Sequence, residues 1–162
     1  MRYLVILILS ACGFRPMYAT DNSRALQQAA DIHIAPVSGF DGQHGIKLRN
    51  EVERNLRADN NGERARYTLR IRMSQPRSQD YTLSKQGTAS SYLITISADY
   101  SIIDNSIGRA VHSDTVNHSL SYGVLVDKYS TEMLRIETIN LIIKNLANQI
   151  SSGTLGFLSM RP

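Results

Sequence analysis

Arginine is concentrated in one stretch of this 162-residue sequence, between positions 49 and 77, where eight arginines stand against four acidic residues. Apolar and polar residues alternate from 64 to 74, which predicts a strand. Four arginines then share its polar face: Arg64, Arg66, Arg70 and Arg72. Guanidinium groups bind phosphate through paired, charge-assisted hydrogen bonds. We predict that Arg66, Arg70 and Arg72 contact an anionic ligand; the alternative is a solvated strand face that discourages edge pairing.

A second group with chemical potential lies further along the chain. His112, Asp114 and His118 share one side of an expected strand, and histidine with aspartate can serve a hydrolase or bind a metal. Along one extended strand, however, such residues diverge over roughly 20 Å at ~3.3 Å per residue. His33 and His44 have no partners in the sequence. We predict partly buried or surface histidines, with no catalytic site, metal site or cofactor.

The only cysteine, Cys12, ends a distinctive N-terminus. Met1-Arg2 is basic, Tyr3 to Leu9 is apolar, and small residues follow, which is the order of a secretory signal. Leu9-Ser10-Ala11-Cys12 resembles the bacterial lipobox, whose cysteine is lipidated on sulfur. The sequence thus predicts a lipoprotein; the alternative is a buried N-terminal strand that contains a cysteine.

This interpretation divides the chain into four parts. We expect a signal peptide at 1–11, a lipidated N-terminus and tether at 12–30, a folded domain at 31–153 and a C-terminal tail at 154–162. Acyl chains such as palmitate on Cys12 would hold the domain at a membrane, because several chains are needed for stable anchoring. Gly13 follows the cysteine in place of the aspartate that often retains lipoproteins in the inner membrane, so the outer membrane is favoured.

Alternation of two hydrophobic periods predicts the elements that position these residues. Period two marks strands at 31–36, 64–74, 91–103 and 109–122, with loops at 38–42 and 76–80. Leu48, Val52 and Leu56 recur every four residues in a helix at 44–58. A last helix begins after a capping Asp127, runs to about Ile150 and stops near Gly153. Its expected apolar stripe comprises Tyr129, Met133, Ile136, Ile143, Leu146 and Ile150.

The order β-α-β-β-β-α predicts an α+β fold: a two-layer sandwich in which two helices cover one face of a four-stranded, mainly antiparallel sheet. The other face would be polar and almost uncharged. Its residues are Thr95, Ser97, Asp99 and Ser101 on one strand and Ser113, Thr115, Asn117, Ser119 and Ser121 on the next. Such a face fits a wet, close-fitting interface with a partner; the alternative is chance composition.

Composition narrows the function classes. The chain is 42% hydrophobic and 20% charged with net charge +4, which is typical of a globular domain with a mild preference for anionic partners. A single cysteine excludes a disulfide-built fold. Nucleic acid is not expected as a partner, because only Tyr67 lies within the arginine strand, on its opposite face.

Several short motifs resemble one known family. Cys12 is followed by Gly13-Phe14-Arg15-Pro16-Met17-Tyr18. Further pieces are Ile34-Ala35-Pro36, Leu48-Arg49-Asn50, Ala98-Asp99-Tyr100 before the turn at Asp104, and Ser121-Tyr122 before the last helix. With the β-α-β-β-β-α order, they resemble the LptE family of lipopolysaccharide-assembly lipoproteins over nearly the whole chain. The last helix lacks the alanine-rich pattern of many relatives.

The resemblance implies a role without catalysis. It implies an outer-membrane lipoprotein that faces the periplasm or the lumen of a barrel, plugs an LptD-type β-barrel, supports its assembly and aids insertion of lipopolysaccharide into the outer leaflet. Lipid A phosphates would then be the anions that meet Arg66, Arg70 and Arg72. The alternative is another outer-membrane lipoprotein adaptor, such as a secretin pilot or an accessory of barrel assembly.

Overall fold

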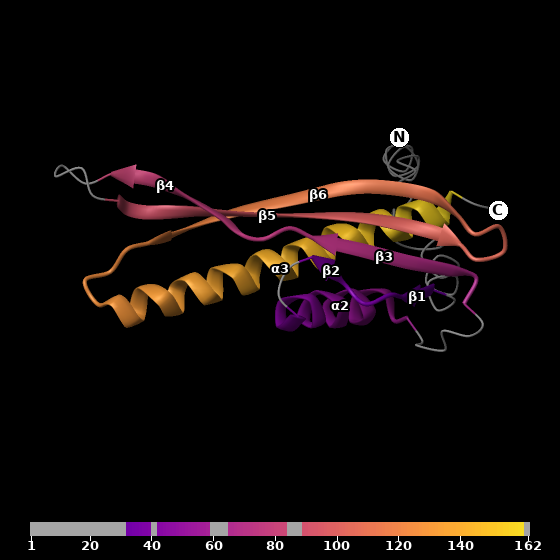
Figure 1. The fold of residues 1–162 in the computed structure, drawn as a ribbon, viewed down its shortest axis with the longest axis horizontal. Coiled ribbons are helices and arrows are strands. Elements are labelled where there is room, and N and C mark those ends of the chain that lie inside the picture. The colour runs from indigo at the N-terminus through magenta and orange to yellow at the C-terminus, as the bar shows by residue number, and fades with distance from the viewer. Residues whose placement is uncertain (1–31, 40–41, 59–64, 84–88, 161–162) are drawn as a thin grey trace, which may run out of the picture.

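The computed structural model describes residues 32–39, 42–58, 65–83 and 89–160, and shows an elongated α+β fold (Figure 1). Its strands are β1 (Ile32–Ile34), β2 (Ser38–Gly39), β3 (Tyr67–Met73), β4 (Arg77–Leu83), β5 (Ala89–Asp104) and β6 (Arg109–Gly123). Its helices are α2 (Gly42–Leu56) and α3 (Lys128–Ser159). The α+β class is confirmed, but the sheet is mixed and has six strands, so the predicted count of four was wrong.

The long strand β5 organises the sheet. On one edge it pairs antiparallel with β3 through Ala98 to Asp104 and with β4 through Ala89 to Thr95. On the other edge it pairs antiparallel with β6 from Ser91 to Asp104. The short strands β1 and β2 pair parallel with β3 at its outer edge. The sheet is therefore mainly antiparallel, with two short parallel additions.

The segment 76–80, predicted as a loop, lies within or beside the strand β4. Ser74, between β3 and β4, keeps the chain beside β5 through two hydrogen bonds. Its N–H donates to the Ser97 carbonyl at 2.8 Å, and its Oγ accepts from the Ser97 N–H at 3.0 Å. Pro76 lies at the break between β3 and β4, where it needs no ladder hydrogen bond. All seven β4 residues are exposed. Main-chain pairing with β5 thus makes this segment a strand, although its sequence has no alternation of apolar and polar residues that would predict one.

The strand β2 was likewise expected to be a turn. It forms because Gly39 approaches the β3 backbone with a positive φ of 106°. A Cβ atom at this position would collide with the carbonyl oxygen of Met73. Only glycine adopts this backbone angle freely and leaves this space.

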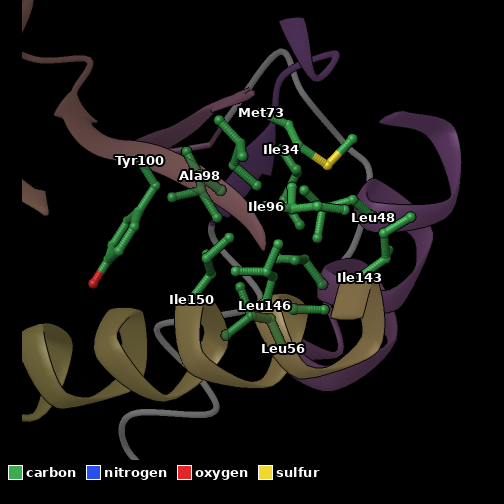
Figure 2. Close-up of a cluster of buried hydrophobic side chains, with 14 of the residues drawn as sticks. Ile34, Leu48, Leu56, Met73, Ile96, Ala98, Tyr100, Ile143, Leu146 and Ile150 are labelled. Atoms are coloured by element: carbon green, nitrogen blue, oxygen red, sulfur yellow. The ribbon is translucent and has the colours of Figure 1, made fainter. Parts of the chain in front are cut away.

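The hydrophobic core lies between one face of the sheet and the two helices (Figure 2). The predicted period-four set on α2, Leu48, Val52 and Leu56, is fully buried, as are Ile34 and Ile96 on the strands. The predicted period-two set on β3 is also buried: Tyr67, Leu69, Ile71 and Met73. Apolar burial at about 25 cal/mol per Å² makes this cluster the main source of stability.

The helix α3 begins as predicted but continues past its predicted end. Asp127 caps it, with its Oδ2 accepting from the Ser130 N–H at 2.8 Å. The Ser130 hydroxyl also donates to Oδ2 at 2.6 Å, and this bond first, then the bond from the Ser130 N–H, holds the pKa of the Asp127 carboxyl below its ordinary value. The helix runs to Ser159 instead of about Ile150, so the predicted tail at 154–162 is helical as far as Ser159. Gly153 lies inside the helix, and the hydroxyl group of Tyr100 occupies the place where a Cβ atom would stand.

Half of the apolar stripe predicted for α3 is buried. Ile143, Leu146 and Ile150 are fully buried, but Tyr129, Met133 and Ile136 are 73%, 48% and 39% exposed. The helix α2 packs only against the C-terminal half of α3 (Figure 1). The N-terminal half therefore keeps part of its apolar stripe uncovered.

The glycine inside α3 gives a test of this packing. Gly153→Leu should lower the free energy of unfolding by about 1–3 kcal/mol, because the added side chain must displace Tyr100 from its buried position. Gly156→Leu is the matched control: no atom lies within 4 Å of a Cβ at that position, and leucine has the higher helix propensity. Urea denaturation measures the free energy of unfolding of both variants. Equal values for the two would contradict the packing of Tyr100 on Gly153.

Candidate functional site

The face of the sheet that α2 and α3 leave open carries the predicted polar surface. The register between β5 and β6 sets Ser97 opposite Asn117, Thr95 opposite Ser119 and Ser101 opposite Ser113. The Thr95 and Ser119 hydroxyl oxygens lie 2.7 Å apart, within hydrogen-bonding distance. Asp99 is the one charged side chain in the predicted set. The predicted residues of β5 and β6 thus form a polar surface with a single charge, but β3 adds the exposed Arg70 and Arg72 to the same face.

A hollow of about 610 Å³ lies on this face where β2, β3, β5 and β6 run side by side. It is lined by Ser38, Arg70, Ile71, Arg72, Asp99, Tyr100, Ser101, Ser113, Asp114 and Thr115. Pairing across the sheet sets Arg72 opposite Asp99, and Asp99 opposite Thr115. The Thr115 hydroxyl donates to Asp99 Oδ1 at 2.8 Å. The Thr115 N–H donates to Asp114 Oδ1, also at 2.8 Å. The hollow thus combines two guanidinium groups, hydroxyl groups and two carboxylates that each accept a hydrogen bond from Thr115.

Two of the three predicted ligand-binding arginines meet in this hollow. Arg70 and Arg72 are exposed on β3, and neither forms an ion pair with a residue that the structure describes. Arg66 precedes β3, and its guanidinium lies over the ring of Tyr67 at 5.2 Å from the centroid. Arg66 does not line the hollow. The fourth arginine of the predicted face, Arg64, lies outside the described residues.

Sequence reasoning missed Ser38 as a member of this site. Its strand β2 pairs with β3 so that Ser38 stands opposite Arg72. The sequence signal, Ser38-Gly39, is indistinguishable from an ordinary turn. Only the parallel pairing of β2 with β3 brings this hydroxyl beside the arginines.

The arginines of α2 differ from those of β3. Arg49 Nε lies 2.7 Å from Glu53 Oε1, and Arg54 pairs with Glu51. These neighbours neutralise the helix arginines locally, as expected from their spacing. The arginines on β3 are therefore better placed to meet an external anion.

Two of the histidines predicted to have no catalytic role, His112 and His118, face the helix side of the sheet. The ring of His112 stacks on Phe157 of α3 with a centroid distance of 5.1 Å, and lies 5.8 Å from the ring of Tyr100. His118 Nε2 lies 2.9 Å from Asn145 Nδ2. His112 and His118 are both partly buried, which is one of the two outcomes predicted for the histidines. Their separate partners give both rings a role in packing the helix onto the sheet.

Two negative findings apply to the described part of the chain. It contains no group of three histidine, cysteine, aspartate or glutamate side chains that could hold a metal ion. None of its helices is both long and apolar enough to cross a membrane. Cys12 lies outside the described residues, so its lipidation stays a prediction.

Comparison with known families identifies the chain. A family model described as LptE, lipopolysaccharide-assembly, matches residues 29–152, which includes every described strand and most of α3. The chain belongs to the LptE family. Members of this family are outer-membrane-associated lipoproteins that assemble lipopolysaccharide without catalysis. A comparison with curated proteins finds no match.

Solved structures share the LptE fold with this chain. A candidate lipoprotein from Caulobacter crescentus is 16% identical with a TM-score of 0.67, and the match covers 86% of this chain and 99% of the other. A minor lipoprotein from Acinetobacter baumannii is 17% identical with a TM-score of 0.60, and the match covers 79% of this chain and 92% of the other. Rare lipoprotein B from Shewanella oneidensis is 12% identical with a TM-score of 0.53, and the match covers 77% of this chain and 96% of the other. At these identities the likeness establishes the fold alone.

The contact between the sheet and α3 gives a prediction about pH. Burial, and then the negative charge of Asp114, raise the pKa of the Tyr100 hydroxyl above its ordinary value of 10.0. The hydroxyl therefore ionises first in the unfolded chain, and its stabilising contribution, complete below pH 10, is lost as pH rises through the folded pKa. Tyr100→Phe should flatten the fall in the free energy of unfolding above pH 10.

Urea denaturation between pH 8 and 11 measures this effect. Asp114→Asn removes only the smaller cause of the raised Tyr100 pKa, the nearby negative charge. It should therefore flatten the fall in the free energy of unfolding less than Tyr100→Phe does. If the free energy of unfolding of Tyr100→Phe kept the full pH dependence of the parent chain, its decrease above pH 10 would have to come from groups other than Tyr100.

Proposed function

We propose that this LptE-family chain is an outer-membrane lipoprotein that plugs an LptD-type β-barrel, supports its assembly and aids insertion of lipopolysaccharide into the outer leaflet. The observation that carries the proposal is the family match over residues 29–152. The open sheet face supports it, because a surface of hydroxyl and amide groups with little charge suits a wet interface inside a lumen. No reaction step is required of this chain.

The anchor in this proposal is the lipidated Cys12. Cleavage of the signal at 1–11 would make it the N-terminus, and 12–30 would tether the domain to the membrane. Acyl chains stabilise this attachment by about 0.8 kcal/mol per buried CH₂ group. The domain would then face the periplasm or the barrel lumen.

The lipopolysaccharide contact in this proposal is the hollow on β3. Lipid A phosphates are anionic, and Arg70 and Arg72 present two exposed guanidinium groups on one rim without an acidic partner among the described side chains. Ser38, Ser101 and Ser113 add hydroxyl groups for sugar or phosphate oxygens. Arg66, which precedes β3, would reach the ligand after leaving the ring of Tyr67.

The first test is the identity of the partner. We expect a stoichiometric LptD-type barrel when the tagged chain is purified from detergent-solubilised outer membranes and its partners are identified by mass spectrometry. Cys12→Ala should reduce recovery from the outer-membrane fraction, because the acyl anchor is lost. Recovery with a secretin or another barrel-assembly machine would instead support a different lipoprotein adaptor.

The second test concerns the arginines. Arg66/Arg70/Arg72→Ala should weaken lipopolysaccharide binding at least tenfold, about 1.4 kcal/mol, since two or three charge-assisted contacts are lost. The control, Arg49/Arg54/Arg135→Ala, removes the same charge from arginines already paired with glutamates, and should change binding less than twofold. Equal losses in both variants would indicate attraction by net charge alone.

A further inference from the structure

The two outer edges beside β5 differ in how they resist pairing with another chain. Exposed strand edges are ordinarily protected by charges, proline or bulges. The β4 edge has such protection: Arg77 and Asp80 are charged, and its register against β5 shifts on both sides of Thr82. The β4 edge is thus unsuited to a further strand.

The C-terminal part of β6, residues 115–123, has none of these features. It contains no charged residue and no proline. It pairs with β5 without a register shift, from Thr115 opposite Asp99 to Gly123 opposite Ser91. Within the described residues its other edge pairs with no strand. Nine residues at ~3.4 Å each give about 30 Å of regular edge, along which alternate residues direct N–H and C=O groups outward.

A groove of about 540 Å³ lies between this edge and α3. It is lined by Thr115, Val116, Asn117, Asn148, Gln149 and Ser152. The contact between His118 and Asn145 joins β6 to α3 beside it. Asn145 begins a stretch of α3 without any charged residue, which extends to Met160. The groove therefore offers amide and hydroxyl groups with no charge on either wall.

We propose that β6 binds an extended strand from a different polypeptide along residues 115–123, by addition to its outer edge. Beyond the Thr115 N–H, which donates to Asp114 Oδ1 at 2.8 Å, outward N–H and C=O groups that alternate in one line are matched by another extended backbone. Sugars and acyl chains have no such repeat. The side chains of the added strand that face α3 would be small or uncharged polar groups, which can bond with Asn148 and Gln149. The strand would come from the barrel partner, so this inference rests on the proposed function.

Hydrogen exchange read by mass spectrometry tests the edge on the full chain. The chain is compared alone in detergent and in the complex extracted from its own membranes. We expect amides in peptides spanning 115–123 to exchange at least tenfold more slowly in the complex, while those of β4, residues 77–83, change less than twofold. Slow exchange confined to 115–123 in an assembly without an LptD-type barrel would support the edge and refute the proposed function.

Three results would overturn the inference. Unchanged exchange at 115–123 in a complex that does contain the barrel would refute the edge and leave the proposed function standing. Extraction of the chain as a monomer would remove any partner strand. Protection that arises only in a homodimer would replace the different polypeptide with a second copy.

A pair of lysine variants separates strand addition from general burial. Ser121 on β6 and Gln79 on β4 stand in one row on either side of Leu93, and both are exposed. Ser121→Lys should lower recovery of the partner at least tenfold, because an edge lysine opposes pairing. Gln79→Lys should leave recovery within twofold. Thermal unfolding must show both variants folded, and equal recovery with the two would overturn the proposal.

Discussion

Main-chain hydrogen bonding along both edges of β5 is the constraint on which the rest of this structure depends. One 16-residue strand holds β3 and β4 end to end on one side and β6 on the other. Among the described strands, the short β1 and β2 pair only with β3. Because β5 is longer than the helix α2 that covers it, the sheet has a covered half and a half that extends beyond the core (Figure 1).

This division separates stability from recognition. The covered half holds the hydrophobic core, in which Leu48 and Leu56 from α2 meet Ile96 and Leu146 (Figure 2). The extended half holds few fully buried side chains, and residues 115–123 of β6 carry no Asp, Glu, Lys or Arg. Burial of apolar area keeps the covered half folded. The hollow lies on the open face of this covered half, whereas the edge of β6 continues into the extended half.

The open face and the edge of β6 make different demands on a ligand. The hollow beside Arg70 and Arg72 combines positive charge with hydroxyl groups, and fits an anionic headgroup. The edge at 115–123 has no charge and offers a line of main-chain groups, which fits a polypeptide. A member of a lipopolysaccharide-assembly family that also plugs a barrel would need both kinds of surface. The fold provides them through the same three strands, β3, β5 and β6.

Periodicity in the sequence was sufficient for the amphipathic elements: Leu48, Val52 and Leu56 on α2, and Tyr67 to Met73 on β3, bury the faces that their spacing predicted. Strand parity also placed Arg70 and Arg72 on one face and His112 and His118 on the other. Only the tertiary structure decided where β2 and β4 pair, that Gly153 receives Tyr100 inside a longer helix, and that Tyr129 and Met133 stay exposed. The physical reason is that a local pattern records which side of an element is apolar. Whether another element covers that side, or pairs with its backbone, depends on contacts between residues far apart in the chain.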